Sequence, residues 1–473
     1  MEQLLYIIKK FVPRGAFKYL RPVYHFTLSW LAAFWYRFPS EKLIVIGVTG
    51  TTGKSTVVHL IAKMLEEAGY RVGYTSTAVF KIADKEWMND RKMTMVGRFF
   101  TQRMLANMQK AGCQYAIIET TSEGIEQFRH RFINYDMALI TGLYPEHIEA
   151  HGSFTNYRNA KGKLFAHLST CPYKYVDADK KAHVIKNEIK KLDLDRVKKI
   201  IIANGDDEHA QYFLNFKADE KIKYEVRSQK REGVKATESN SDIATVVASK
   251  VEANSGGIYF TINGITFHLR LMGEFNIGNA LAAVSVGLAQ GLPLEIIKEG
   301  LEKISGVPGR FERIDEKQNF SVIVDYAFEP NAVAKLYETI KTLNYQKVIH
   351  VLGSAGGGRD LARRPRLGML AGENADIVII TNEDPYDDDP QIIIDQVGLG
   401  AEKAGKELNR NLFKILDRRE AIRKALAFAN ANDVVLITGK GCEQAMCVAG
   451  GKKIPWDDRE AVREELLRMK NSS

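Results

Sequence analysis

The stretch Gly47-Val-Thr-Gly-Thr-Thr-Gly-Lys-Ser-Thr56 decides the fold of this chain. It follows the apolar run Leu43–Ile46 and precedes a helical pattern over Val57–Glu66. Glycines let the backbone wrap closely around a phosphate, so that N–H groups and the helix N-terminus point at the anion. In the spacing G-x-x-x-x-G-K-[ST], Lys54 supplies a positive charge, and the hydroxyl that follows suits the magnesium ion accompanying a nucleotide. The stretch therefore predicts a nucleotide-binding loop between a strand and a helix.

The length and composition predict a folded protein with more than one domain. A chain of 473 residues is too long for a single hydrophobic core. With 45% hydrophobic and 26% charged residues, the composition excludes a disordered or fibrous chain. The net charge of +9 suits anionic substrates, nucleic acid or anionic lipid, without choosing among them. The four cysteines form no C-x-x-C pair, which indicates a reducing cytosol and neither a disulfide framework nor a zinc ribbon.

Residues 1–40 differ from the rest of the chain. Basic residues up to Arg21 precede an apolar, aromatic run, Val23–Tyr36. As a helix this run would span only about 21 Å, short of the roughly 30 Å hydrocarbon core of a bilayer. It lacks a small-residue cleavage site, so a secretory signal is not expected. Two interpretations stay open: a helix docked on the protein's own surface, or a helix lying in a membrane interface.

From residue 41 to residue 306, short β-rich runs alternate with helical patterns, which predicts a mainly parallel sheet covered on both faces. The candidate buried strands are Leu43–Ile46, Tyr115–Ile118, Met137–Ile140 and Lys199–Ala203. The alternating segment Ile258–Leu269 surrounds Asn263-Gly264, a strong hairpin signal. We expect this hairpin to form an antiparallel flap on the sheet.

A second, Rossmann-like α/β domain is predicted for residues 307–473. Its candidate strands are Ser321–Val324, Lys347–Leu352, Ile377–Thr381 and Val434–Thr438. Polar or glycine-rich loops follow them: Asp325-Tyr326, Gly353–Asp360, Asn382–Pro390 and Gly439–Glu443. Ligands of open parallel sheets bind outside the carboxyl ends of the strands. We therefore expect a second ligand-binding edge that faces the phosphate loop.

Two segments of the first domain carry groups that suit a cation. Glu119 ends a predicted buried strand, where nucleotide sites place a magnesium ligand or a water-orienting base. The segment Glu146-His-Ile-Glu-Ala-His151 holds two histidines and two glutamates after the next strand. A lone histidine is usually structural, but this density fits a cation site better.

Eight short motifs follow one another from the phosphate loop toward the C-terminus. They are Gly50–Thr56, Glu119–Ser122, Glu146–Gly152, Tyr157–Lys161, Gly278–Ala280, Val307–Arg313, Asp325–Ala327 and Gly439–Gly441. In this order they resemble the motifs of the ATP-dependent Mur ligases, and most of all those of the tripeptide synthetases of that family. The resemblance extends from Leu43 to the C-terminus.

The resemblance implies a reaction. ATP would phosphorylate a carboxylate of UDP-N-acetylmuramoyl-L-alanyl-D-glutamate, and the amine of an amino acid would attack the acyl phosphate to leave an amide. Such chemistry depends mostly on charge neutralisation and positioning. The resemblance further implies a cytoplasmic, monomeric enzyme of peptidoglycan precursor synthesis that needs Mg²⁺ and has no nucleic-acid partner.

The resemblance also assigns residues to this reaction. Those expected to bind ATP are Gly50, Thr51, Thr52, Gly53, Lys54, Ser55, Thr56, Asn279, Arg310 and Asp325. Those expected around Mg²⁺ are Ser55, Glu119, His147 and Lys161. The residues expected to be catalytic are Lys54, Glu119, His147 and Lys161. Acceptor positions are Thr94, Thr121, Gln127 and Arg129. Amino-acid positions are Arg359, Glu383, Asp384, Tyr386, Gly439 and Glu443.

Lys161 matches a lysine that is carbamylated in most of these ligases. The carbamate would convert a cation that repels Mg²⁺ into an oxygen-donor anion. Without the resemblance, Lys161 would be interpreted as a surface lysine on a helix.

Two of the chain's departures from the family bear on its substrates. Ligases that use meso-diaminopimelate usually carry Asp-Asn-Pro-Arg where this chain has Glu383-Asp-Pro-Tyr386, and tyrosine cannot grip a carboxylate as arginine does. The following acids, Asp387–Asp389, would favour a cationic side chain, so lysine is expected ahead of diaminopimelate unless these acids form only a solvated loop. The N-terminal segment of about forty residues replaces a larger uridine-binding domain. Either the central domain does most of the binding, or the acceptor is not UDP-linked.

Two alternatives stay open for the function. One is a Mur-like ligase for another carboxylate, such as a folylpolyglutamate, cyanophycin-type or membrane-linked acceptor. The other is a nucleotide-switched binding protein. This alternative is disfavoured because Lys161, Asp325 and Arg359 coincide with ligase positions.

Overall fold

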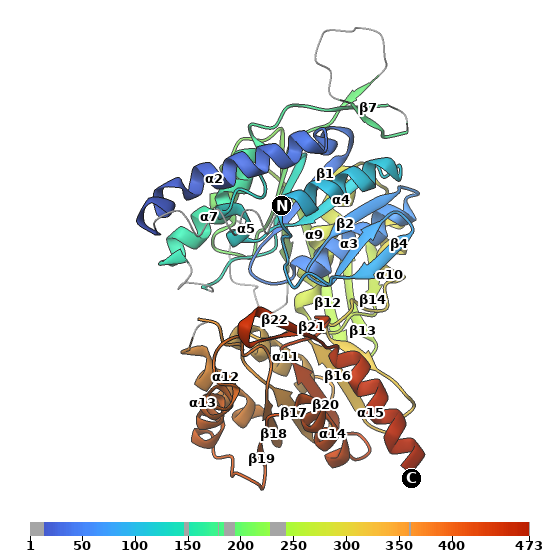
Figure 1. The fold of residues 1–473 in the computed structure, drawn as a ribbon. Coiled ribbons are helices and arrows are strands. Elements are labelled where there is room, and N and C mark those ends of the chain that lie inside the picture. The colour runs from blue at the N-terminus through green and yellow to red at the C-terminus, as the bar shows by residue number, and fades with distance from the viewer. Residues whose placement is uncertain are drawn as a thin grey trace.

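A computed structural model describes residues 14–145, 151–177, 179–183, 194–227, 243–358 and 361–472 of the protein. Two α/β lobes, one above the other in Figure 1, are built from early and late parts of the chain. The predicted fold class is confirmed. The predicted division at residues 306 and 307 falls between the last helix of the first lobe and the first strand of the second, and the domain boundaries themselves stay a prediction.

Within the described residues, the larger sheet has eleven strands in the order β14-β13-β12-β11-β10-β6-β1-β5-β2-β3-β4. Their bounds are β1 Ile44–Thr49, β2 Val72–Thr75, β3 Val79–Ile82, β4 Lys85–Met88, β5 Tyr115–Glu119, β6 Met137–Ile140, β10 Ile200–Asn204, β11 Glu220–Val226, β12 Ile243–Asn254, β13 Gly257–Ile262 and β14 Ile265–Leu269. The run from β2 to β12 is parallel, and each edge ends in antiparallel strands. The carboxyl ends of the parallel strands therefore meet along one edge.

Helices cover both faces of this sheet. One apolar core packs α3 Lys54–Glu67, α9 Phe275–Ala289 and α10 Leu294–Glu302 against it. The other packs α4 Arg98–Lys110, α5 Ser122–Glu126, α7 Phe154–Leu168 and α8 Ala210–Leu214. A separate small sheet consists of the three strands β7 Tyr175–Val176, β8 Ala182–His183 and β9 Asp195–Arg196.

The predicted strands of the first lobe are confirmed to within a few residues. The hairpin at Asn263-Gly264 is also present, with φ of 47° and 85° at the two turn residues. It is not a separate flap. Because β13 pairs with β12, the hairpin continues the large sheet as its edge.

The second sheet of the described chain has six strands in the order β15-β16-β20-β17-β18-β19. Their bounds are β15 Glu312–Ile314, β16 Ser321–Asp325, β17 Val348–Leu352, β18 Ile377–Thr381, β19 Leu412–Ile415 and β20 Val434–Thr438. Helices α11 Pro330–Lys341, α12 Arg363–Asn374 and α13 Pro390–Lys403 cover one face, and α14 Arg418–Phe428 and α15 Asp458–Ser472 cover the other. The hairpin of β21 Ala445–Val448 and β22 Lys452–Pro455, joined by η3 Ala449–Gly451, lies between the lobes (Figure 1).

Helix α2, Arg14–Trp35, lies across the first lobe ahead of η1 Pro39–Lys42 (Figure 1). Its inner side is docked, because Ala32 and Ala33 are fully buried and Ser29 donates a hydrogen bond of 2.9 Å to the carbonyl of Phe128. This agrees with the docked interpretation. Among the described helices, none is long and apolar enough to cross a membrane.

Candidate active site

The phosphate loop connects β1 to α3 as predicted, and close packing explains its glycines. Gly50 and Gly53 have φ of 145° and 80°, a region that side-chain-bearing residues rarely adopt. A Cβ at Gly50 would overlap the side chain of Thr141, and one at Gly53 would overlap that of Asn279. The loop thus leaves its N–H groups at the start of α3, where helix geometry favours an anion.

Glu119 stands at the carboxyl end of β5, against the phosphate loop. Its side chain is buried, and Ser55 Oγ donates to its Oε2 at 2.8 Å. Thr77 donates twice, from its backbone N to Oε2 at 2.7 Å and from its Oγ1 to Oε1 at 2.9 Å. These contacts hold one carboxylate and one hydroxyl beside the loop.

This oxygen set fits magnesium rather than a metal with nitrogen or sulfur ligands. Mg²⁺ is usually bound through one or two carboxylates together with substrate phosphates and waters. No group of three or more His, Cys, Asp or Glu side chains in the described ranges could hold a metal by itself. Glu119 and Ser55 would therefore complete a site only together with a nucleotide. His147, predicted to join them, lies outside the described residues.

Lys161 lies on α7 and reaches the phosphate loop from beneath. Its side chain is buried, and its Nζ donates to the carbonyl of Gly50 at 2.9 Å. The same Nζ lies 4.5 Å from the ring centre of Tyr157. This position contradicts the interpretation of Lys161 as a surface lysine.

Two predicted ATP-binding residues, Arg310 and Asp325, lie near the start of the second lobe. Arg310 donates from its guanidinium to Ser55 Oγ at 3.2 Å, and its guanidinium lies 4.3 Å from the ring centre of Tyr326. Asp325 accepts from the backbone N–H groups of Phe311 and Ala327 at 2.6 and 2.7 Å. Burial raises the pKa of Asp325. The second lobe thus places a cation directly over the phosphate loop.

One cavity of about 980 Å³ lies between the lobes and collects most of the predicted site residues. Its lining includes Thr51–Thr56, Thr94, Glu119, Thr121, Arg129, Asn279, Arg310, Asp325, Glu383, Asp384, Tyr386, Gly439 and Glu443. Gly50, Gln127 and Lys161 are not part of this lining. Gln127 instead accepts a hydrogen bond of 2.7 Å from Arg129 and thereby positions the Arg129 side chain. Arg359 lies outside the described residues.

The predicted acceptor positions lie on the first-lobe wall of the cavity. Thr121 caps α5, because its Oγ1 accepts from the N–H of Gly124 at 3.1 Å. Arg129 donates to the carbonyl of Met95 and to Gln127. Its Nε is buried without a hydrogen-bond partner among the described residues. Burial lowers the pKa of Arg129. A buried donor at the wall suits an incoming carboxylate.

Lys92 bridges the two lobes inside the predicted amino-acid site. Its Nζ lies 2.5 Å from Asp384 Oδ2 and 3.0 Å from Glu443 Oε2, and only 5% of its side chain is exposed. Burial acts to lower the pKa of Lys92, but the carboxylates of Glu443 and Asp384 outweigh it and raise that pKa. Lys440 pairs with the same two acids at 3.0 and 2.6 Å. Both carboxylates are therefore already neutralised by lysines of the chain itself.

The acids Asp387–Asp389 do not line the cavity. Asp387 accepts from the N–H of Gly450 at 2.8 Å, Asp388 pairs with Arg364 at 3.3 Å, and Asp389 caps α13 through the N–H of Gln391 at 2.8 Å. They stabilise local structure, which agrees with the alternative of a loop without a direct role, and the preference for a cationic side chain stays a prediction.

Glu383 is a buried carboxylate at the end of β18. Its Oε2 accepts no hydrogen bond from the described residues, and it lies against the backbone of Gly439, whose φ is 103°. Burial, and to a lesser degree the charge of Asp384, raises the pKa of Glu383 to about 7. Glu383 therefore exchanges a proton near neutral pH.

We expect Glu383→Gln to stabilise the protein at pH 8 and to have little effect at pH 5. The unfolded chain loses the Glu383 proton near pH 4.5, whereas the folded protein keeps it up to about pH 7, so the free energy of unfolding falls between these values. The variant should gain about 3 kcal/mol at pH 8. Chemical denaturation at both pH values measures this gain, with Glu373→Gln, an exposed position on α12, as control. Equal changes at both pH values would contradict the prediction.

Sequence reasoning missed two contributors to the site. Thr77 lies two residues after the end of β2, so a polar residue following a buried strand could have signalled it. Lys92 carried no such signal, because its partners lie 292 and 351 residues later in the chain.

A phosphate loop, a buried carboxylate beside it and a second α/β lobe closing over both define a nucleotide-dependent, two-lobed enzyme. Residues 48–287 match the Mur ligase middle domain, and residues 309–441 match the Mur ligase glutamate ligase domain. The chain belongs to the Mur ligase family and is an ATP-dependent ligase that forms amide bonds.

Individual relatives agree with this assignment. The chain is 36% identical to UDP-N-acetylmuramyl-tripeptide synthetase of Roseiflexus sp. (strain RS-1), over 93% of this chain and 82% of that one. It is 34% identical to UDP-N-acetylmuramoyl-L-alanyl-D-glutamate--2,6-diaminopimelate ligase of Geobacillus thermodenitrificans (strain NG80-2), over 92% and 81%. A solved diaminopimelate ligase structure superposes with a TM-score of 0.56 at 25% identity, covering 91% of this chain and 79% of the other. Mycobacterium tuberculosis folylpolyglutamate synthase superposes at 0.63 with 15% identity, over 88% and 92%, which shows a shared fold alone.

Proposed function

We propose that this ligase adds a diamino acid, L-lysine or meso-diaminopimelate, to UDP-N-acetylmuramoyl-L-alanyl-D-glutamate in peptidoglycan precursor synthesis. One observation carries the proposal: a single cavity is lined by the phosphate loop, by the acceptor wall at Arg129 and by the amino-acid segment Glu383–Tyr386. Carboxylate, phosphoryl donor and amine must meet in one place for amide formation through an acyl phosphate.

Different residues of the cavity have different roles in phosphoryl transfer. Lys54 and Arg310 neutralise phosphate charge from the two lobes, and Arg129 orients the acceptor carboxylate. Glu119 and Ser55 would hold Mg²⁺, which when bound neutralises phosphate oxygens. Glu383 lies on the amino-acid side, where an incoming ammonium would favour the charged form of its buried carboxylate, whose pKa burial raises to about 7.

We also propose that Lys161 is carbamylated in the active enzyme. Its buried position under Gly50 supports this, because a carbamate there would add oxygen donors with a negative charge beside the phosphate loop. Without the carbamate, the buried ammonium of Lys161 would be a second positive charge at the phosphate loop, in addition to that of Lys54.

Two observations bear on the identity of the amino acid. Tyr386 lines the cavity where diaminopimelate ligases usually carry arginine, which favours lysine. The named relatives favour diaminopimelate.

A phosphate-release assay tests the proposed function. Protein, ATP and Mg²⁺ are mixed with UDP-N-acetylmuramoyl-L-alanyl-D-glutamate and a panel of amino acids including lysine and diaminopimelate. Release that requires both the acceptor and one amino acid is expected. Release with a folate or aspartate-polymer acceptor instead, or no dependence on any amino acid, would overturn the proposal.

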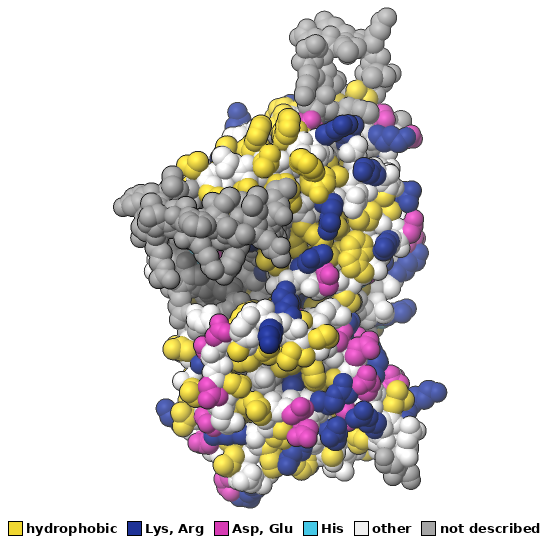
Figure 2. Space-filling model, viewed as in Figure 1, with side chains coloured by type: hydrophobic (Ala, Val, Ile, Leu, Met, Phe, Trp, Pro, Cys, Tyr) yellow, Lys and Arg dark blue, Asp and Glu magenta, His cyan; other side chains and the backbone are white. Residues whose placement is uncertain are grey.

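We place the enzyme in the cytoplasm as a monomer, in peripheral contact with the membrane through α2. The outer side of α2 exposes Val23, Phe26, Trp30, Leu31, Phe34 and Trp35, with Trp35 66% exposed. Figure 2 shows apolar side chains gathered where α2 runs in Figure 1. Exposed Arg21 and Arg37 flank this stripe. Aromatic rings beside basic residues suit the headgroup region of an anionic bilayer.

Flotation with phosphatidylglycerol-containing vesicles should recover the full chain with the lipid at low salt. The double variant Phe34→Asp, Trp35→Asp should stay in solution, whereas Leu467→Asp, an exposed apolar position on α15, should float as the unaltered protein does. Equal partition of all three proteins would contradict the membrane contact.

A further inference from the structure

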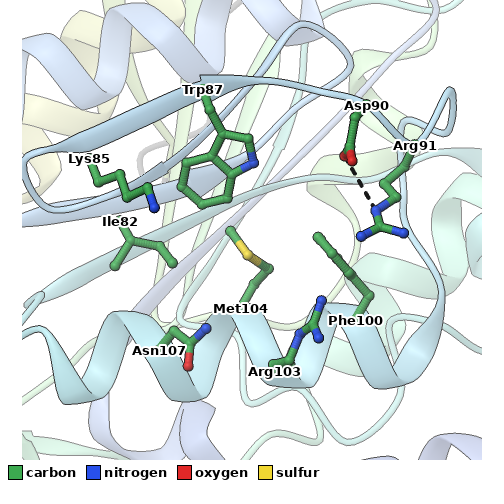
Figure 3. A pocket seen from close by; sticks show the side chains of 9 residues that line it. All are labelled: Ile82, Lys85, Trp87, Asp90, Arg91, Phe100, Arg103, Met104 and Asn107. Atoms are coloured by element: carbon green, nitrogen blue, oxygen red, sulfur yellow. Dashed lines mark ion pairs between the residues drawn. The ribbon is translucent and has the colours of Figure 1, made fainter.

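A second hollow lies beside the catalytic cavity, between the β3–β4 hairpin and α4. It has a volume of about 460 Å³, within the roughly 300–1,000 Å³ of typical ligand pockets. Figure 3 shows Met104 and Phe100 rising from α4 toward Trp87 on β4. None of the residues assigned to the ligase reaction above lines this hollow.

The floor of the hollow is aromatic and held in place. Phe80, which is fully buried, contacts both rings, with centres 6.0 Å from Trp87 and 5.5 Å from Phe100. Flat apolar surfaces of this kind accept a planar ring by stacking, whatever its detailed hydrogen-bonding pattern.

The rim of the hollow is cationic. The guanidinium groups of Arg91 and Arg103 each lie 4.9 Å from the ring centre of Phe100, and Lys85 Nζ lies 5.7 Å from that of Trp87. One carboxylate, Asp90, opposes these three cations in the lining, at 3.3 Å from Arg91 Nε. The surplus of two positive charges matches a diphosphate diester, which carries two negative charges, and arginine forks suit phosphate oxygens.

The hollow and the catalytic cavity share one loop. Arg91 lines the hollow, whereas the next residue, Lys92, and the acceptor position Thr94 line the cavity. Three residues of extended chain span at most about 10 Å. Lys453 Nζ of the second lobe donates to the carbonyl of Arg91 at 3.3 Å and fixes this loop between the two binding regions.

We propose that this hollow binds the nucleoside diphosphate end of the acceptor. The base stacks on Trp87, and Arg91, Arg103 and Lys85 hold the diphosphate. The exposed amide of Asn107, at the foot of the hollow in Figure 3, supplies a donor and an acceptor for the edge of a pyrimidine. The sugar and peptide then pass Thr94 toward the phosphate loop. This inference rests on the proposed function, since a UDP-linked acceptor supplies the ligand.

Direct binding of UDP tests the site without turnover. Titration with UDP should quench the fluorescence of Trp87 in the full-length protein, and Trp87→Phe should lose that quenching. Uridine and inorganic pyrophosphate alone should bind at least about 10-fold more weakly than UDP, because each makes only part of the contacts. Lys54→Ala should quench normally, which excludes binding at the phosphate loop. Equal quenching in Trp87→Phe would overturn the proposal.

Kinetics provide the second readout. Arg103→Ala and Asn107→Ala, both exposed positions, should raise the KM for the acceptor about 10-fold while kcat and the KM for ATP stay unchanged. Lys110→Ala, an exposed cation on the same helix outside the hollow, should leave all three constants unchanged. An unchanged acceptor KM in both pocket variants would overturn the inference and leave the proposed function standing. UDP quenching without turnover of any muramoyl acceptor would support the hollow and defeat the proposed function.

Discussion

Replacing Lys54 with alanine should lower the rate of ATP-dependent phosphate release about 10²–10³-fold. Lys54 starts α3 at the mouth of the phosphate loop, and its Nζ is held by the carbonyl of Thr51 at 2.8 Å. This contact keeps the ammonium positioned before the nucleotide arrives. Phosphoryl transfer spreads negative charge over the transferred group, and a fixed cation in a closed cavity stabilises that charge far more than water does.

The matched control is Lys63→Ala on the same helix. Lys63 is 36% exposed and pairs with Glu66 at 3.3 Å, away from the cavity lining. Its loss should leave the rate within a factor of about two, because exposed ion pairs contribute little. Both variants should unfold at the temperature of the unaltered protein within a few degrees. A Lys54→Ala rate close to that of the control would contradict the assignment of the phosphate loop.

Lys161→Ala should lower the rate about 10²-fold, and short carboxylates such as formate or acetate should restore part of it. The substitution removes the buried group that lies under Gly50, and a small carboxylate can enter the space and supply the oxygens of the missing carbamate. The measurement is phosphate release by the variant as the concentration of added carboxylate rises, compared with chloride at equal ionic strength.

Lys163→Ala provides the control for Lys161. It lies two residues along α7, is 55% exposed and pairs with Glu126 at 2.7 Å. Its rate should match that of the unaltered protein and should not respond to carboxylates. If Lys161→Ala loses activity but no carboxylate restores it, Lys161 acts as a positioning amine and the carbamate proposal fails. Mass spectrometry of the unaltered protein under bicarbonate provides an independent check.

Much of the fold was predictable because its signals are local. Strands β6, β18 and β20 lie where their apolar runs indicated, and the turn at Asn263-Gly264 forms as its residues require. The placement of the hairpin was not predictable. Whether β13 pairs with β12 or covers the sheet depends on contacts between faces, which a local pattern does not contain.

The predicted site residues also divide into those that local sequence could place and those that it could not. Glu119 and Asp325 could be placed because each ends a parallel strand, and such ends meet at one edge of a sheet. The contacts of Asp387–Asp389 could not be predicted, because sequence proximity to the amino-acid segment does not reveal which way three neighbouring side chains point. Their hydrogen bonds direct them to Gly450, Arg364 and the start of α13 instead.

The sequence by itself determined that this protein has a phosphate loop, two α/β units and the ordered motifs of an ATP-dependent ligase. Only the tertiary structure decided the electrostatics of the cavity. Lys92 meets Asp384 and Glu443 across the two lobes, and burial brings the pKa of Glu383 to about 7. Local motifs follow from backbone geometry over a few residues, whereas charge pairing and desolvation depend on which distant segments the fold brings together.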